Sequence, residues 1–336
     1  MRASRMNALY PLLMTPLFDP RPWGTHDLSP IYPNQRFSQK IGESWLTGDQ
    51  CKVANGLLTG RTLAELSSEY GGELVGEAAR DAKRFPLLMK FLFPNEKLSV
   101  QVHPDDQSAQ GVGEPWGKTE CWYVVNADPG AQVALGMKPG MSRVQLEEGI
   151  RNNRAEDLLN WVDVYRGDLI YVAGGTVHTL GPGSIIVETQ QQSDTTYRLY
   201  DYGRPRELHL ERGLAAVKEE HGSGKVVRPA VASGNGSQHE ELVAAPYFVV
   251  ERFFLKESKS LTTTDESCVR SVQILLALDG NGSVEVTGLE PVRFGKGDAV
   301  VVPASVWNFE VRPQGTLEFL LAHVPGKPLP EPTVSL

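Results

Sequence analysis

Two polar side chains lie close together in the stretch "LSVQVHPDD", residues 98–106. The first residues of this stretch alternate as in a β-strand, and Pro104 ends the strand. Side chains of a strand repeat with a period of two, so Gln101 and His103 are predicted to share one face. That face carries an amide oxygen and an imidazole, and the two aspartates that close the stretch are typical of a turn.

Three more polar residues occur in otherwise apolar strand patterns, namely Glu120, His178 and Glu188. Two imidazoles, a carboxylate and an amide oxygen suit a borderline cation such as zinc, and the neutral amide leaves the ion with net positive charge. A single strand histidine is more often hydrogen-bonded than metal-bound, and Glu120 could simply pair with Lys118. The combination favours a metal site, because buried polar groups need partners.

Helices are predicted where residues have capping-box spacing, at Thr62 with Glu65 and at Ser142 with Gln145. The first pair predicts a helical segment that extends to Phe85 and is split at Gly71 and Gly72, and the second predicts one that continues through "AEDLLNWV". A third helix is predicted for "PRELHLERGLAAVKEE". Most of the remaining chain has the pattern of strands and turns.

The C-terminal part of the chain reads as all-β, since short β-patterned runs alternate with turn residues from 245 to 324. Residues 221–241 are rich in glycine, serine and charge and are predicted to form an exposed connection. We therefore expect a catalytic β-barrel domain with helical segments at residues 1–240 and a metal-free β domain at 241–336. The strand pattern around Trp307 places that residue in the core of the second domain.

An internal repeat supports two related β units. The segment "GDLIYVAGGTVHT" from Gly167 aligns without gaps with "GDAVVVPASVWNF" from Gly297. Each has a Gly-Asp turn, a strand, a corner of small residues and a second strand, which we interpret as two copies of one β-barrel unit. His178 of the first copy aligns with Asn308 of the second, so the first copy is predicted to carry the chemistry.

Composition narrows the class of partner. The 336 residues are 40% hydrophobic and 22% charged, as in an ordinary globular protein. A net charge of −8 without a basic run argues against nucleic acid or an anionic membrane as the main partner, while a small anion would need only a local basic cluster. Three isolated cysteines (Cys51, Cys121 and Cys268) and no long apolar run favour a cytoplasmic protein, which we expect to be a monomer.

Four motifs together resemble the zinc-dependent, type I mannose-6-phosphate isomerases: "LSVQVHPDD", "GKTECWYVV", "GTVHTLGPG" and "ETQQQSDTTYRLYDYGR". The resemblance extends from about Pro11 to Val324 and is strongest to the short bacterial form. It implies a mainly β fold of two cupin, or jelly-roll, barrels with a small helical portion. One departure is Ala173 in "VAGGTVH", where relatives usually have proline, but this is a turn position and not a ligand.

The resemblance also implies roles for particular residues. One zinc ion per chain would be held by Gln101, His103, Glu120 and His178. The catalytic residues would be Arg198, Lys118 and Glu188, and the substrate-binding residues would be Lys90 and Ser99.

The implied reaction interconverts mannose 6-phosphate and fructose 6-phosphate through an enediolate. It needs a general base, positive charge at the developing oxyanion, and cations for the phosphate. Alternatives are a cupin isomerase for another sugar phosphate, such as glucose 6-phosphate, or a non-catalytic sugar-binding cupin. An iron oxygenase fits less well, because its expected His-x-His pair is Gln-x-His here. Lys118 could instead be a surface cation, Glu188 could support a metal ligand, and Arg198 could pair with Asp194 or Asp201.

Overall fold

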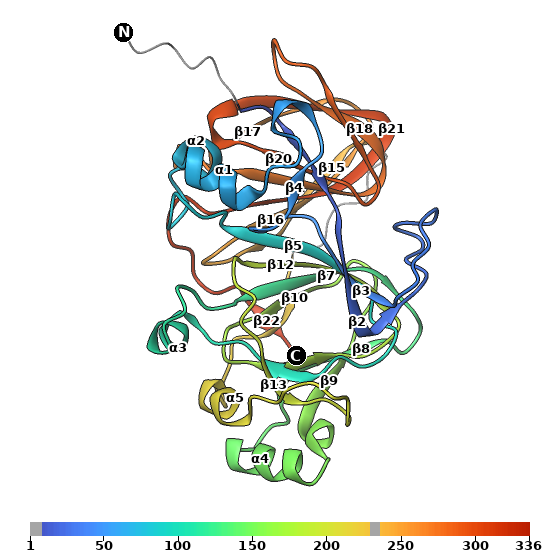
Figure 1. Cartoon of the computed structure of the whole chain (residues 1–336), viewed down its shortest axis with the longest axis vertical. Coiled ribbons are helices and arrows are strands. Elements are labelled where there is room, and N and C mark those ends of the chain that lie inside the picture. Colours follow the sequence, from blue (N-terminus) through green and yellow to red (C-terminus); the bar gives the residue numbers. More distant parts are fainter. Residues whose placement is uncertain (1–8, 229–235) are drawn as a thin grey trace.

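A computed structural model describes residues 9–228 and 236–336, so part of the predicted connection at 221–241 lies outside the described residues. The described chain is mainly β with a small helical portion, as the resemblance implied, and it forms three antiparallel sheets and five short α-helices. Figure 1 shows the sheets stacked along the long axis of the molecule, with α4 and α5 at one end. No helix in these two ranges is long and apolar enough to cross a membrane.

Two of the sheets form what we call the N-terminal unit, and their facing sides enclose an apolar cluster that includes Trp122, Ile186 and Leu135. The eight-stranded sheet has the order β2 (Leu17–Thr25), β3 (Ile41–Trp45), β5 (Leu87–Leu92), β12 (Ser184–Gln191), β7 (Glu120–Ala127), β10 (Leu169–Val172), β14 (Gly224–Val226) and β22 (Val334–Ser335). The five-stranded sheet has the order β13 (Tyr197–Tyr200), β6 (Val100–Val102), β11 (Val177–Leu180), β8 (Gln132–Met137) and β9 (Leu159–Asp163).

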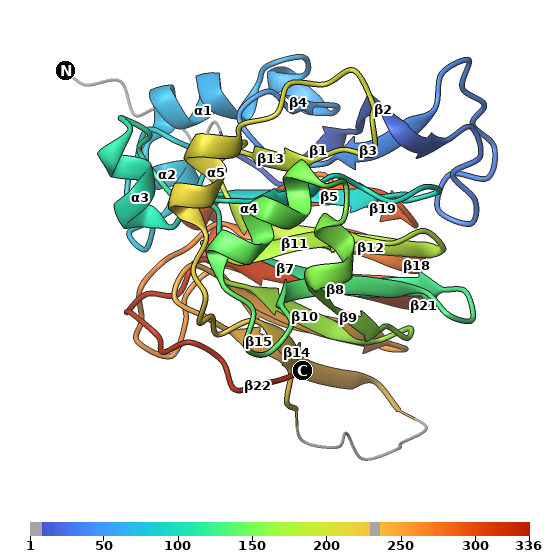
Figure 2. The same ribbon diagram turned by 90° about the horizontal axis from the view of Figure 1, so that it is seen from below.

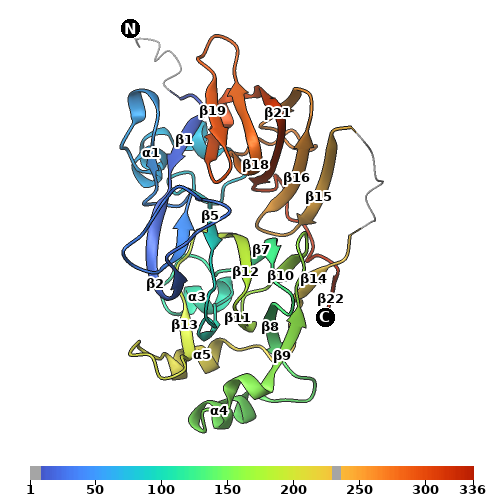
Figure 3. The same cartoon turned by 90° about the vertical axis from the view of Figure 1, so that its right-hand side faces the viewer.

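The nine-stranded sheet, which we call the C-terminal unit, bends around its own apolar cluster of residues such as Phe253, Val300 and Phe319. Its main path is β15 (Gln238–Ala244), β16 (Val249–Leu255), β21 (Asn308–His323), β18 (Gln273–Glu285), β20 (Ala299–Val302), β1 (Leu12–Thr15) and β4 (Lys52–Val53). Strand β17 (Lys259–Thr262) pairs with β21, and β19 (Val292–Gly295) pairs with β18. Figure 3 shows this unit at one end of the molecule.

The two units share the largest apolar core of the molecule, to which Phe91 and Tyr123 of the eight-stranded sheet and Ile274 of the nine-stranded sheet contribute. The chain also crosses between them, because β1 pairs with β20 and β22 pairs with β14. The Tyr32 hydroxyl adds a 2.8 Å hydrogen bond to the carbonyl of Gly297. The predicted boundary at residue 240 stays a prediction.

Both predicted capping boxes are confirmed. Helix α1 (Leu63–Tyr70) begins after Thr62, whose side chain and backbone exchange hydrogen bonds with Glu65, and α4 (Arg143–Arg151) begins in the same way after Ser142. Helix α5 (Leu210–Ala216) lies within the third predicted helix. Helices α4 and α5 pack on the outer side of the five-stranded sheet over a separate apolar cluster, as Figure 2 shows.

Other local predictions were wrong because tertiary pairing and turn geometry override propensity. The predicted split at Gly71, whose φ is +53°, is confirmed, but the helical tail to Phe85 is wrong, since only the single turn α2 (Gly72–Val75) follows before residue 86. The "AEDLLNWV" segment does not continue the helix, because it forms a 3₁₀ turn (Ala155–Leu158) and then β9, which pairs with β8. The aspartates after Pro104 open a helix, because Asp105 caps α3 (Asp106–Gly111) through the Ser108 amide.

The two aligned repeat segments fold alike at their turns and first strands. Gly167 and Gly297 have φ values of +91° and +86°, a conformation that glycine adopts without steric cost. The next residues, Asp168 and Asp298, each accept a 2.9 Å hydrogen bond from the backbone amide three positions earlier.

The segments differ at the corner, where the second copy forms a 3₁₀ turn (Ala304–Val306) before Trp307. The prediction that Trp307 lies in the core is therefore wrong. Its side chain is 52% exposed and its φ is +68°, while Phe309 takes the buried position two residues later.

Candidate metal centre and active-site cavity

Three predicted metal ligands converge where the two sheets of the N-terminal unit meet. Strand β11 supplies His178, the residue after β6 is His103, and Glu120 opens β7 on the facing sheet. The ligand atoms of these side chains lie within 4.8 Å of one another, and all three residues are buried. Residues 75 positions apart are thus brought to one point by strand pairing.

The two imidazoles are held in the orientation that metal binding requires. Nδ1 of His103 lies 2.9 Å from the Thr195 carbonyl, and Nδ1 of His178 lies 2.9 Å from the Thr176 carbonyl. Since a carbonyl only accepts, the proton is on Nδ1 and each Nε2 lone pair points toward Glu120, at 3.4 Å for His103 and 3.5 Å for His178. Burial lowers the pKa of both imidazoles, that of His178 to about 4, which favours the neutral form.

Gln101 lies beside this group because the β6–β11 register places it opposite His178. Its amide nitrogen is 3.3 Å from Nε2 of His178, and its amide oxygen accepts a hydrogen bond from the Ser99 hydroxyl at 3.1 Å. A half-turn about the last bond of the side chain exchanges the two amide atoms and presents the oxygen to the group.

The donor set fits a zinc ion. Two neutral imidazole nitrogens, a carboxylate and a reachable amide oxygen are ligands that zinc accepts, and the backbone carbonyls behind the imidazoles fix their orientation. Two of these ligand groups contact a cation in this structure, because the Lys118 ammonium lies 2.9 Å from Nε2 of His103 and 2.8 Å from Glu120. The pairing of Glu120 with Lys118 is thus present, but the alternative of a surface cation is wrong, since Lys118 is only 4% exposed.

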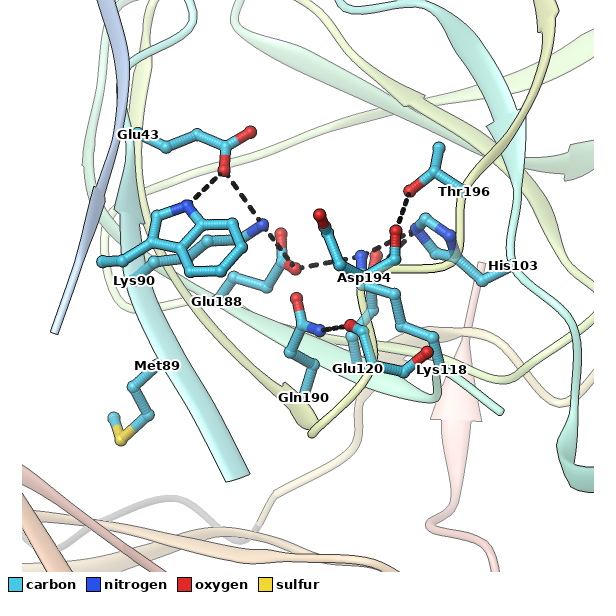
Figure 4. Close-up of polar contacts among 12 residues, drawn as sticks. Glu43, Met89, Lys90, His103, Lys118, Glu120, Glu188, Gln190, Asp194 and Thr196 are labelled. Carbon is cyan, nitrogen blue, oxygen red and sulfur yellow. Dashed lines mark hydrogen bonds and ion pairs between the residues drawn. The ribbon is translucent and has the colours of Figure 1, made fainter. Parts of the chain in front are cut away.

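A row of buried charges continues away from the ligands (Figure 4). Lys118 lies 3.3 Å from Glu188, Lys90 lies 3.4 Å from the same carboxylate, and Lys90 lies 3.3 Å from Glu43. Burial alone would lower the pKa of Lys118 and Lys90, but the neighbouring carboxylates raise both. Burial, reinforced by Glu120, raises the pKa of Glu188. For Glu43, Lys90 and Arg21 outweigh burial and lower the pKa to about 2.

A cavity of about 410 Å³ opens over this row, between the two sheets of the N-terminal unit. The predicted site residues that line it are Lys90, Ser99, Gln101, Lys118, Glu120, His178, Glu188 and Arg198. His103 reaches the same point through its contacts with Lys118 and Glu120. Further polar side chains line the cavity without any signal in the sequence pattern, namely Arg21, Glu43, Asp194, Thr196 and Arg206.

Arg198 enters the cavity from β13, whose register places it beside Gln101 on β6. One guanidinium nitrogen donates to the Glu207 carbonyl at 2.8 Å, while Nε is buried without a hydrogen-bond partner among the described residues. Asp201 pairs with Arg204 and Arg206 instead, and within residues 9–228 and 236–336 Arg198 has no ion-pair partner. Burial and the nearby Arg206 lower its pKa. Arg198 therefore keeps donors free for an anion in the cavity.

A family model and similar curated proteins point to the same family. Residues 23–135 match the model of the type I phosphomannose isomerase catalytic domain. The chain is 35% identical to the mannose-6-phosphate isomerase of Streptococcus mutans over 325 residues, which covers 93% of this chain and 98% of that protein. It is 34% identical to mannose-6-phosphate isomerase ManA of Bacillus subtilis over 337 residues, with 94% and 99% covered.

A solved structure agrees with these relatives. The crystal structure of mannose 6-phosphate isomerase from Bacillus subtilis superposes with a TM-score of 0.82 at 31% identity, covering 94% of this chain and all of that one. The chain therefore belongs to the mannose-6-phosphate isomerase family, and its residues 23–135 are the part that matches the type I catalytic domain.

Proposed function

We propose that this protein is a zinc-dependent aldose-ketose isomerase that interconverts mannose 6-phosphate and fructose 6-phosphate. The observation that carries the proposal is the convergence of His103, Glu120 and His178 at the base of a cavity that also holds Arg198 and Lys118. A metal ligand set and two cations in one cavity suit a reaction in which an oxyanion develops on a phosphorylated sugar. The names of the relatives support the substrate.

One zinc ion would be held by Gln101, His103, Glu120 and His178, and it would supply positive charge to the oxygens at C1 and C2. The chain's own residues supply the rest. Arg198 presents unused guanidinium donors toward the cavity and is assigned to the developing oxyanion.

Lys118 and Glu188 form a 3.3 Å ion pair beside the ligands, and we assign to this pair the transfer of the proton between C1 and C2. A general base must lie within hydrogen-bond reach of the carbon that it deprotonates, and both groups lie on the wall of the cavity. Lys90 and Ser99 line the same wall and are assigned to substrate binding.

Within residues 9–228 and 236–336, the group around Glu120 is the one set of three or more histidine, cysteine or acidic ligands close enough to hold a metal. We therefore propose that residues 241–336 carry no metal. A cytoplasmic monomer, acting on a small sugar phosphate and on neither nucleic acid nor membrane, is the state that we propose from the composition.

The test combines metal analysis with a coupled assay. Purified protein is analysed for bound metals by mass spectrometry, and fructose 6-phosphate formation from mannose 6-phosphate is measured before chelation, after chelation and after zinc is returned. We expect about one zinc per chain and activity that follows its removal and return. Turnover that survives complete metal removal would refute the role of zinc.

The same assay separates the alternatives. Faster turnover of glucose 6-phosphate than of mannose 6-phosphate would indicate an isomerase for another sugar phosphate. Binding of mannose 6-phosphate without turnover in the metal-loaded protein would indicate a non-catalytic cupin.

A further inference from the structure

The C-terminal unit contains a second cavity, of about 670 Å³, that the proposed reaction does not use. Its walls come from β15, β16, β17, β18 and β21 and from the segment that follows β21. Polar side chains that line it include Glu251, Thr262, Thr264, Gln273, Asn308 and His323.

Strand registers show that this cavity occupies the position of the active-site cavity in the other unit. In the N-terminal unit Gln101 pairs opposite His178, and in the C-terminal unit Thr262 pairs opposite Asn308, which is the residue that aligns with His178. Two residues further along the chain, beyond the ends of β6 and β17, Thr264 takes the place of His103.

The counterpart of the remaining ligand, Glu120, follows from the pairing of the first strand in each repeat segment. Glu120 pairs opposite Val172 in the first unit, and Gln273 pairs opposite Val302, the residue aligned with Val172, in the second. The set Gln101, His103, Glu120 and His178 is thus replaced by Thr262, Thr264, Gln273 and Asn308, all of which line the second cavity. Every ionisable or imidazole ligand has become a neutral group that can both donate and accept a hydrogen bond.

The charges of the second cavity are also changed. Lys90, which pairs opposite Glu188, corresponds to Glu251, which pairs opposite Leu321. Nε2 of His239 lies 2.6 Å from the Glu251 carboxylate, and this contact takes the place of the Lys90–Glu43 ion pair of the first unit. Among the described residues the lining holds no arginine, and the charged residues there are Glu241, Glu251, Lys259, Asp265, Glu266 and Lys327. With four carboxylates against two ammonium groups, the cavity disfavours a phosphate dianion.

We propose that this cavity binds a neutral polyhydroxylated ligand, an unphosphorylated sugar or a polyol. Hydroxyl and amide groups match sugar hydroxyls as both donors and acceptors, and the Thr262 and Thr264 hydroxyls stand 2.9 Å apart. Nδ1 of His323 is buried without a hydrogen-bond partner among the described residues, and Gln273 is only 4% exposed. Buried polar atoms beside a cavity of this size are typical of a small-molecule site.

The test measures binding of D-mannose, D-mannitol and mannose 6-phosphate to the full-length protein by isothermal titration calorimetry. The variants Thr262→Val and Asn308→Leu each remove hydrogen-bonding groups with little change in volume. The control Thr316→Val makes a comparable change at an exposed position of β21 outside the cavity lining. The melting temperature of each variant checks that it is folded.

We expect D-mannose or D-mannitol to bind, and Thr262→Val and Asn308→Leu each to weaken that binding about 3- to 10-fold. The Thr316→Val control should bind as the unchanged protein does, and the affinity for mannose 6-phosphate should be the same in all variants. The proposal is overturned if neither neutral probe binds, or if both folded cavity variants bind it with unchanged affinity. Weaker binding of mannose 6-phosphate alone in these variants would also overturn it, because the cavity would then take the phosphorylated sugar.

Discussion

His178 and Asn308 each follow a Gly-Asp turn and a buried strand of the same length, one in each unit. His178 is 1% exposed and faces a carboxylate, whereas Asn308 is exposed at the start of β21. The two segments also differ at the corner, where the second copy forms a 3₁₀ turn and the first does not. The shared frame fixes where side chains meet, and the side chains at those positions decide the chemistry.

The two cavities also differ in how their charges are paired. In the N-terminal unit, Lys118, Glu188 and Lys90 are buried and linked in a row, so removal of one member leaves another charge unpaired in the interior. In the C-terminal unit, the contact between His239 and Glu251, which takes the place of the Lys90–Glu43 pair, lies at a partly exposed position. Loss of a buried charge is costly and loss of an exposed one is not, so equivalent substitutions in the two units should have unequal effects.

The largest difference is expected for His178→Ala against Asn308→Ala. Removal of the imidazole takes one of two nitrogen donors from the metal group, so the protein should lose bound zinc and nearly all isomerase activity. The matched Asn308→Ala variant should keep about one zinc per chain. Metal content per chain and the coupled assay check both. Full zinc and near-normal turnover in His178→Ala would show that the ligand set is wrong.

The next effect is expected for Arg198→Ala, which should leave zinc content and folding intact. Its guanidinium has no ion-pair partner among the described residues, so the fold loses little when it is removed. Loss of one donor to a developing oxyanion typically costs on the order of 100- to 1000-fold in kcat. We expect kcat and kcat/KM to fall together, because Lys90 and Ser99, the residues assigned to substrate binding, remain in place. A raised KM with unchanged kcat would restrict Arg198 to ground-state binding.

A third comparison sets Glu43→Gln against His239→Gln, the corresponding positions of the two units. Glu43 is buried against Lys90 and Arg21, and its removal should cost on the order of 3 kcal/mol of unfolding free energy. His239 has a side chain that is 49% exposed, so its removal should cost less than about 1 kcal/mol. Urea unfolding measures both, and equal costs would show that burial does not distinguish the two pairs.

Glu43 also predicts a pH dependence. Lys90 and Arg21 outweigh burial and lower its pKa in the folded state from 4.5 to about 2. A carboxylate with a lowered pKa contributes stability that is complete above its unfolded pKa and is lost as the pH falls through its folded pKa. Unfolding free energies measured from pH 5 down to pH 2 should therefore fall less steeply in Glu43→Gln than in the unchanged protein.

The local signals of the sequence predicted the capping boxes of α1 and α4 and the common turn of the repeat, because each depends on residues a few positions apart. Motif resemblance, which carries long-range information, predicted residues that meet only through strand pairing, such as His103 and Glu120. Arg21 and Glu43 were missed, because their contacts join strands whose pairing no short pattern reveals. Residues 159–162 were assigned to the wrong element for the same reason, since β9 exists only through its pairing with β8.

The smallest effect is expected for Trp307, the residue that the alternation of the strand had placed in the core. Its ring is 52% exposed and lies 4.9 Å from the Arg270 guanidinium, so Trp307→Ala loses a cation–π contact worth about 0.5–1 kcal/mol and less buried area than the loss of a core aromatic ring would. Because its φ is +68°, Trp307→Gly should be more stable than Trp307→Ala by roughly 0.5–1 kcal/mol. Phe309→Ala is the matched core variant and should cost about 3–5 kcal/mol, since that ring is 4% exposed. Chemical denaturation of the three variants gives the order, and a cost for Trp307→Ala as large as that for Phe309→Ala would show that the corner of the C-terminal unit is packed as tightly as its core.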